Sequence, residues 1–251
     1  MKDQTADTTA DSAQPQKSGA QCVIDGLVHA GCEVLFGYPG GAVLDIFNCL
    51  YDAPFHFVLT RHEQGAVHMA DGYARATGKP GCCLVTSGPG ATNTVTGLAT
   101  AYMDGIPLVC ITGQVALNMI GNDAFQEADV IGITRPVTKH NFLVRDADEL
   151  PGIIAKAFYI ATTGKPGPVV IDIPKNIQKQ KTAALPPSTV SMRAYHPDMA
   201  INPAEIAQFA ELINRAERPL LYVGGGAVNG DASGILSALA HKANIPVCTT
   251  L

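Results

Sequence analysis

The sequence predicts an α/β fold: a parallel sheet flanked by helices, followed by the start of a second, Rossmann-like α/β domain. Short apolar segments rich in Val and Ile alternate with longer helical segments, which is typical of a parallel sheet covered on both faces. A polar, Pro-rich segment interrupts the alternation at 176–202, and the pattern then restarts. The chain of 251 residues is 47% hydrophobic, so it can bury a sizeable core.

In the first domain we expect five or six strands between residues 33 and 173. The apolar segments predict strands at 33–36, 55–60, 81–87, 107–112 and 167–174. The helical segments lie at 19–31, 42–52, 63–78, 91–105 and 147–164. Residues 113–140 lack a clear periodicity and are expected to form irregular structure.

The boundaries follow from shifts in composition. Residues 1–17 are polar and of low complexity, and they are expected to form a disordered tail. The first domain then covers 18–175, a linker covers 176–202, and a second α/β domain begins at 203–251. Two strands could not complete a sheet of their own, so this second domain is expected to be truncated, with the remainder supplied by a partner or a longer protein.

Composition excludes several classes of function. The net charge of −5 argues against a nucleic-acid or polybasic membrane surface, and no apolar segment is long enough to span a membrane. The seven cysteines contain no C-x-x-C pair and are interpreted as reduced core thiols of a cytoplasmic protein. His62 and His68 are six residues apart, which places them on different helix faces, so no metal site is predicted.

In an open α/β sheet, ligands bind beyond the carboxyl ends of the strands. Those ends carry "GYPGG" (37–41), "RHE" (61–63), "TSGPGATN" (86–93) and "TGQ" (112–114). Glycines allow the backbone to approach a ligand closely, and a wall of small residues with one carboxylate suits a flat heterocycle. Glu63 is the candidate acid–base residue. The alternative is that Glu63 only stabilises the start of its helix through the helix dipole.

Several motifs occur in order and at consistent spacing: "FGYPGGAVLDIF", "RHEQGAVHMADGYARATGKPG", "TSGPGATN", "IPLVCITGQV", "IGNDAFQE", "TKHNFLV" and "GPVVIDIPKNIQ". Together they resemble the large, catalytic subunit of the acetohydroxyacid (acetolactate) synthase family, from about residue 18 to the end. The resemblance implies a thiamine-diphosphate-dependent enzyme that decarboxylates pyruvate and joins the two-carbon fragment to a second 2-oxo acid, pyruvate or 2-oxobutyrate, in branched-chain amino acid synthesis.

Two alternatives remain beside this interpretation. One is another thiamine-diphosphate enzyme, such as a 2-oxo acid decarboxylase or pyruvate oxidase. The other is a non-catalytic fragment that only dimerises or binds cofactor. Because the family's diphosphate-binding domain is absent from residues 1–251, we expect this chain alone to lack activity.

The resemblance also implies residue roles. Glu63 would hydrogen-bond a ring nitrogen of the cofactor's aminopyrimidine and act in its activation. Residues expected near the cofactor are Tyr38, Pro39, Gly40, Thr86, Pro89, Asn93 and Gln126. Residues expected near the substrates are Gly41, Ala42, Phe125 and Lys175. Gly224, Gly225 and Gly226 correspond to a turn that holds a structural FAD.

Further expectations concern cofactors, partners and departures from the family. Magnesium would be bound by ligands outside this chain. The resemblance implies a cytoplasmic homodimer whose active site lies between the subunits, with a regulatory small subunit as a further partner. Lys165 stands where the family often has an FAD-binding Arg, and "ALN" at 116–118 replaces a common Pro-Arg-Arg.

Overall fold

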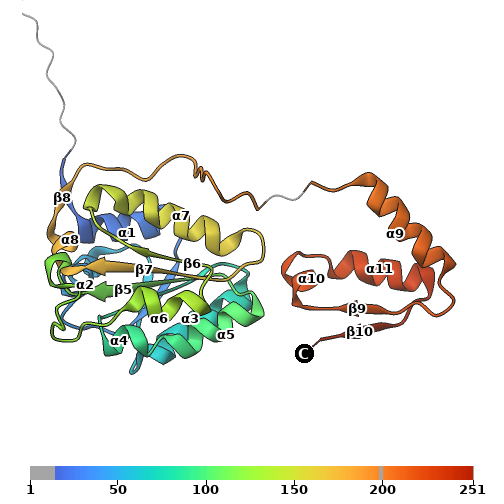
Figure 1. Ribbon diagram of the computed structural model, residues 1–251, viewed down its shortest axis with the longest axis horizontal. Coiled ribbons are helices and arrows are strands. Elements are labelled where there is room, and N and C mark those ends of the chain that lie inside the picture. Colours follow the sequence, from blue (N-terminus) through green and yellow to red (C-terminus); the bar gives the residue numbers. More distant parts are fainter. Residues whose placement is uncertain (1–14, 198–199, 251) are drawn as a thin grey trace, which may run out of the picture.

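The computed structural model describes residues 15–197 and 200–250 (Figure 1). The first unit contains a six-stranded parallel sheet with the strand order β3-β2-β4-β5-β7-β6. The strands are β2 (Val34–Gly37), β3 (His56–Leu59), β4 (Gly81–Val85), β5 (Leu108–Gln114), β6 (His140–Leu143) and β7 (Pro168–Pro174). The predicted parallel α/β fold is therefore confirmed.

Helices cover both faces of this sheet (Figure 1). One face carries α1 (Gly19–His29), α2 (Leu44–Cys49) and α7 (Leu150–Thr162). The other carries α3 (Glu63–Thr77), α4 (Pro89–Thr92), α5 (Val95–Asp104) and α6 (Val130–Thr134). Successive strand side chains point to opposite faces, and accordingly Leu84 and Ile111 join the first cluster while Cys83 and Cys110 join the second.

Polar and glycine residues cap several helices of the first unit. Ser18 caps α1 by accepting a hydrogen bond from the Gln21 amide at 3.2 Å. Gly78 ends α3 in the left-handed region with φ 71°, and Gly105 ends α5 with φ 69°. These caps fix where each helix meets the loops at the strand ends.

Three local expectations were wrong. The region expected to be irregular, 113–140, contains the short helix α6, and at its end begins β6, a strand that was not expected and that pairs with β7 at the sheet edge. The helix expected at 91–105 is divided into α4 and α5. The helix expected at 42–52 is α2 followed by a 3-10 turn at Leu50–Asp52. Short elements of this kind carry too few residues for a period to be read.

The segment after β7 folds back onto the first unit. It forms α8 (Lys175–Lys179) and β8 (Lys181–Thr182), and β8 pairs antiparallel with β1 (Lys17–Ser18). Lys17 therefore belongs to a strand rather than to a tail, and the rest of the predicted tail lies largely outside the described residues. Short elements thus occupy the beginning of the segment interpreted as a linker.

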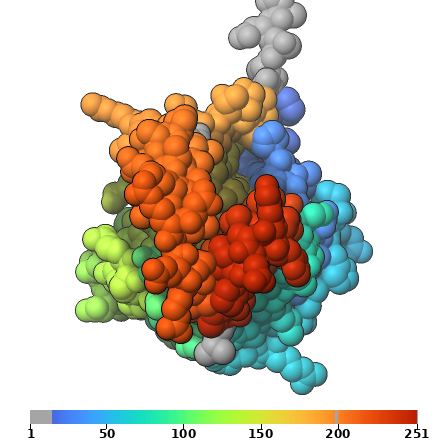
Figure 2. All heavy atoms as spheres, turned by 90° about the vertical axis from the view of Figure 1, so that its right-hand side faces the viewer, coloured from blue at the N-terminus to red at the C-terminus, as the bar shows by residue number. Residues whose placement is uncertain are grey.

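The C-terminal unit contains α9 (Pro203–Arg215), β9 (Leu221–Val223), α10 (Gly225–Asn229), α11 (Ser233–Ala243) and β10 (Val247–Thr249). Its two strands pair in parallel. Ile245 is the only buried residue among those described from 203 to 250. In Figure 2 these orange and red residues form a group of their own facing the viewer.

The seven cysteines are all free thiols, and Cys22, Cys82, Cys83 and Cys110 are buried as expected for core residues, whereas Cys32 and Cys49 are partly buried and Cys248 is exposed. A hydrogen bond with a neighbouring thiol, Cys32 for Cys82 and Cys110 for Cys83, together with burial raises the pKa of Cys82 and of Cys83 well above the usual value. No helix of the described chain is long and apolar enough to cross a membrane.

Candidate active site

Glu63 is the first residue of α3, directly after the loop that follows β3. Its neighbour His62 caps the helix, because the His62 Nδ1 accepts a hydrogen bond from the Gln64 amide at 3.1 Å. The Glu63 side chain turns inward instead and is 8% exposed. Its Oε2 accepts a hydrogen bond from Asn93 Nδ2 at 3.0 Å. Two residues that the sequence placed in one site are thus in direct contact.

Two glycines bring the neighbouring loops onto Thr86, which follows β4 and is buried. A Cβ atom at Gly40 would lie 2.5 Å from the Thr86 side chain, and one at Gly90 would lie 2.6 Å from it and 3.3 Å from Glu63 Oε1. Real Cβ atoms do not approach this closely, so both loops need glycine to reach this side chain. The result is a surface of backbone and small side chains beside the Glu63 carboxyl.

Both backbone polar groups of Ala42, its amide and its carbonyl, form hydrogen bonds with side chains. Its amide donates to Thr86 Oγ1 at 3.3 Å, and its carbonyl accepts from Gln178 Nε2 at 2.7 Å. Gln178 lies in α8, is fully buried, and also donates to the Ile173 carbonyl at 3.1 Å. The sequence analysis missed Gln178, because it fell in the predicted linker. The residues around it, "KNIQKQK" at 175–181, are mostly polar, so the only available signal was its place at the end of the motif "GPVVIDIPKNIQ".

Gln126 reaches the same place from the loop after β5. Gly88 has φ 54°, and a Cβ there would lie 2.3 Å from the Gln126 carbonyl oxygen. Gln126 is itself in the left-handed region, with φ 55°, which is uncommon for a residue with a side chain. The turn that starts α4 and the Gln126 backbone therefore fit together only because residue 88 is glycine.

The other predicted residues of the first unit are exposed and take no part in these buried contacts. Tyr38, Pro39, Gly41 and Pro89 belong to the two loops but are exposed, and Phe125 is 87% exposed. Lys175 is exposed at the start of α8. Gly224 precedes α10, and Gly225 and Gly226 form its first turn, so the three lie where β9 leads into α10 in the C-terminal unit.

A buried acidic network lies beneath the loop that carries Gln126. Asp172 accepts hydrogen bonds from Thr112 Oγ1 at 2.6 Å and from Gln114 Nε2 at 3.0 Å. Burial raises the pKa of Asp172 to about 7 even though both hydrogen bonds favour the carboxylate, and the nearby charge of Asp129 adds to the effect. The sequence analysis assigned no role to this carboxyl.

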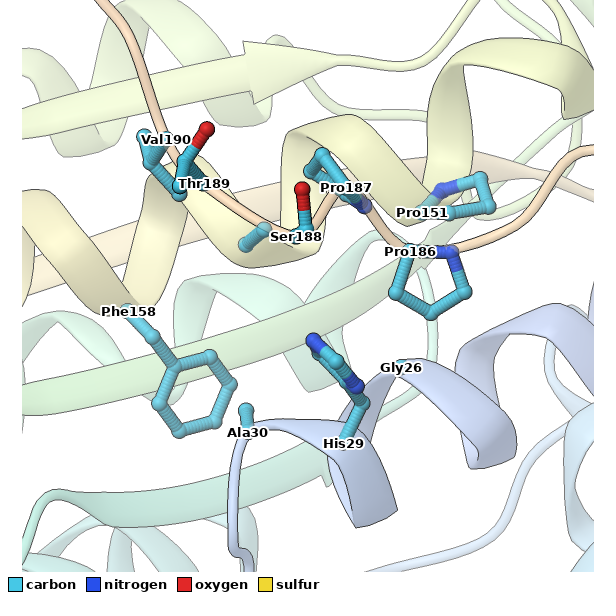
Figure 3. A pocket seen from close by; sticks show the side chains of 11 residues that line it. Gly26, His29, Ala30, Pro151, Phe158, Pro186, Pro187, Ser188, Thr189 and Val190 are labelled. Atoms are coloured by element: carbon cyan, nitrogen blue, oxygen red, sulfur yellow. The ribbon is translucent and has the colours of Figure 1, made fainter.

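A separate cavity of about 190 Å³ lies under the chain at 186–190, where that segment passes over α1 and α7 (Figure 3). Its labelled lining includes His29, Phe158, Pro186 and Pro187, which come from different segments around one hollow. None of the predicted site residues lines it. The Pro-rich segment at 186–190 thus packs against α1 and α7 of the first unit and encloses this cavity with them.

Comparison with known proteins assigns the fold and the site to a class. Residues 17–133 match the thiamine pyrophosphate enzyme, N-terminal TPP binding domain, and residues 206–251 match the thiamine pyrophosphate enzyme, central domain. The chain belongs to the thiamine pyrophosphate enzyme family. The first match contains Glu63, Thr86 and Asn93, which are the residues that the structure brings together.

The similarity extends to a particular kind of enzyme. The chain is 51% identical to the acetolactate synthase large subunit of Buchnera aphidicola subsp. Schizaphis graminum, with 93% of the chain and 42% of that protein covered. It is 50% identical to the acetolactate synthase isozyme 3 large subunit of Escherichia coli (93% and 41%) and 52% identical to the acetolactate synthase of Mycobacterium bovis (95% and 39%). The resemblance stated from the motifs is confirmed, and the chain spans about two fifths of the length of these relatives.

The residues present fit the aminopyrimidine end of thiamine diphosphate. Such a ring needs a partner for its ring nitrogen and flat walls that let it approach. The Glu63 carboxyl provides the first: Asn93 holds its Oε2, while no protein donor in the described chain reaches Oε1. The glycines at 40 and 90 provide the second, because side chains at these positions would collide with Thr86.

Proposed function

We propose that this chain contributes the pyrimidine-binding part of an acetolactate synthase. The proposed reaction decarboxylates pyruvate and joins the remaining two-carbon unit to a second 2-oxo acid, pyruvate or 2-oxobutyrate. One observation carries the proposal: an inward-facing carboxyl at the start of α3, held by Asn93 and bordered by Gly90 and Thr86. The identity of about 50% to acetolactate synthases supports the choice of reaction.

In this proposal each residue has a limited task. Bound thiamine diphosphate supplies the group that stabilises the carbanion after loss of CO₂. Glu63 binds the ring nitrogen N1′ of the aminopyrimidine and moves a proton at that atom, and Asn93 orients the carboxyl by its 3.0 Å hydrogen bond. The Thr86 side chain and the backbone at 40–42 form the wall beside the ring, and Gln178 keeps that wall in place through the Ala42 carbonyl.

The remaining parts of the proposal concern further groups. Magnesium would be held by ligands outside this chain, since the described residues contain no group of three or more metal-ligating side chains. A structural FAD would contact the C-terminal unit near Gly224, Gly225 and Gly226. Phe125 and Lys175, both exposed, would border the substrate channel of a homodimer. A cytoplasmic location and a regulatory small subunit complete the proposal.

Product analysis tests this function. The intact protein, incubated with pyruvate, thiamine diphosphate and Mg²⁺, is expected to release CO₂ and form acetolactate, and addition of 2-oxobutyrate should give the mixed product. Acetaldehyde or acetyl phosphate in place of acetolactate would assign the protein to a decarboxylase or oxidase of the same cofactor class. Residues 1–251 alone are expected to give no turnover, and acetolactate from them would contradict that expectation.

A further inference from the structure

Asp172 lies near the carboxyl end of β7, between β5 and the edge strand β6, and is 1% exposed. Register places it opposite Thr112 of β5, whose hydroxyl donates to Asp172 Oδ1 at 2.6 Å. Gln114, two residues further along β5, donates to Oδ2 at 3.0 Å. Both carboxyl oxygens therefore have a partner from the neighbouring strand.

Gln114 is 3% exposed, and its side-chain amide is held by three hydrogen bonds. Its Oε1 accepts from the Val115 amide at 2.9 Å, and its Nε2 donates both to Asp172 and to the Ala128 carbonyl at 3.0 Å. Turning the amide over would place its oxygen against two acceptors and its nitrogen against a donor. The Asp172 carboxyl, together with the Val115 amide and the Ala128 carbonyl, thus favours one orientation of Gln114, and in that orientation Gln114 binds Ala128.

Ala128 lies near the end of the loop at 115–129, which carries Phe125 and Gln126. Within the loop, the Glu127 carboxylate accepts hydrogen bonds from the amides of Gly121 and Ala124, and these contacts lower the pKa of Glu127. These hydrogen bonds hold the loop together, so a shift of the backbone at Ala128 should also shift Gln126, two residues away. At Gln126 there is little freedom, because its carbonyl fits against Gly88.

Burying a carboxyl at this position costs free energy, and a buried group with a shifted pKa is a candidate for a functional role. Asp129 and Glu127, from the loop, line the same cavity of about 230 Å³ as Asp172 and Gln114, and the charge of Asp129 opposes ionisation of Asp172. The hydrogen bond to Gln114 persists in both forms: when Asp172 is protonated on Oδ1, the Thr112 hydroxyl can accept that proton's hydrogen bond while Oδ2 still accepts from Gln114.

We propose that Asp172 is a positioning residue: it fixes the Gln114 amide, which holds the Ala128 carbonyl and so keeps Gln126 against the Gly88 turn beside Glu63. Its catalytic consequence rests on the proposed function, whereas its effect on the loop does not. The feature that matters is an acceptor at Oδ2 rather than a negative charge.

Three variants of the intact protein separate these features. Asp172→Leu removes the acceptor at similar size and leaves a Gln114 donor unpaired. Asp172→Asn keeps an oxygen toward Gln114 with its amide toward Thr112, so it removes only the charge. Thr112→Val removes the other hydrogen bond and leaves the Gln114 contacts intact. We expect Asp172→Leu alone to speed amide hydrogen exchange at 116–129 by at least about tenfold.

The kinetic measurement is a double-mutant cycle with Gln126→Ala. Asp172→Leu should lower kcat/KM for pyruvate by about tenfold, Asp172→Asn should stay within about threefold, and Asp172→Leu should have little further effect in the Gln126→Ala background. Effects that multiply fully, or unchanged exchange at 116–129 in Asp172→Leu, would overturn the proposal.

Two outcomes are kept distinct. If the wild-type protein makes no acetolactate, the proposed function fails, and the hydrogen-exchange measurement still decides the positioning role. If Asp172→Leu does not fold, Gln114→Met is used in its place, because it removes the link to Ala128 while Thr112 still satisfies one carboxyl oxygen. Unchanged loop exchange in that variant would refute the positioning role equally.

Discussion

The six-stranded unit and the C-terminal unit use the same alternation of strands and helices, yet only the first encloses a core. Ile111 and Ile171 of the large sheet are fully buried, whereas Phe209 and Ile235 of the C-terminal unit are 54% and 76% exposed. A parallel sheet must be covered on both faces and needs several strands to do so. The alternation of apolar and helical segments therefore predicts secondary structure, but the number of paired strands decides whether a hydrophobic core forms.

The same difference separates the two units functionally. In the six-stranded sheet, the loops after β2, β3, β4, β5 and β7 meet at one edge, which brings Glu63, Thr86 and Gln178 together although they are distant in sequence. In the C-terminal unit, Gly224 follows β9, and the only strand pairing with β9 in the described chain is β10. Several loops thus meet to form a site in the first unit, whereas the C-terminal unit offers only the single turn after β9.

The largest expected effect tests whether the chemistry belongs to the first unit. In the intact protein, Glu63→Gln should lower the rate of acetolactate formation by about 10²–10⁴-fold, the usual effect of removing a positioned proton-transfer group. The matched change in the other unit, Glu211→Gln on exposed α9, should leave the rate within about twofold. Steady-state assays with pyruvate measure both. A loss below about threefold for Glu63→Gln would contradict its role.

The next effect concerns the core. Ile111→Ala should lower the free energy of unfolding of the first unit by about 2–5 kcal/mol, because it opens a cavity at a fully buried position. Ile235→Ala, the same change at an exposed position, should alter stability by no more than about 0.5 kcal/mol. Urea denaturation of residues 1–251, followed by hydrogen exchange in each unit, measures both. Equal losses would show that the C-terminal unit has a core after all.

A third prediction concerns pH. Between about pH 4 and 7 the folded protein retains a proton on Asp172 that the unfolded chain has released, since its pKa rises from 3.8 to about 7 on folding. The contribution of Asp172 to the free energy of unfolding should therefore fall as pH rises through this range, by at most about 4 kcal/mol, and level off above it.

Asp172→Asn, which cannot ionise, is the control for this pH dependence. Denaturant midpoints of both proteins between pH 4 and 8 should converge at the acidic end and diverge toward pH 8, where the wild type is less stable. Parallel curves would show that Asp172 does not titrate in this range.

The smallest expected effect compares two helix caps. Ser18→Ala should destabilise the first unit by about 1 kcal/mol, because the Ser18 hydroxyl caps α1 against the core. Asn202 caps α9 in the same way, accepting from the Ala204 amide at 3.1 Å, but Asn202→Ala should affect only the local stability of α9. Hydrogen exchange at the first turn of each helix distinguishes a global from a local loss.

The sequence by itself determined the parallel α/β class and the glycine-rich turns at the strand ends. It also singled out Glu63, because glycine-rich turns lie at the neighbouring strand ends, although the helix dipole alone could explain an acid at the start of a helix. Apolar periodicity and turn residues are local properties, so they could be read without a structure. Asn93, which the motif resemblance placed near Glu63, proved to be its hydrogen-bond partner.

Only the tertiary structure showed β6, the division between α4 and α5, and the hydrogen bonds that hold the site loops. Gln178 binds Ala42 across 136 positions, and Gln114 binds Asp172 across 58. Such pairs depend on strand order and register, which no local pattern specifies. A buried polar side chain needs a hydrogen-bond partner, and which residue is that partner becomes known only when the strands are placed side by side.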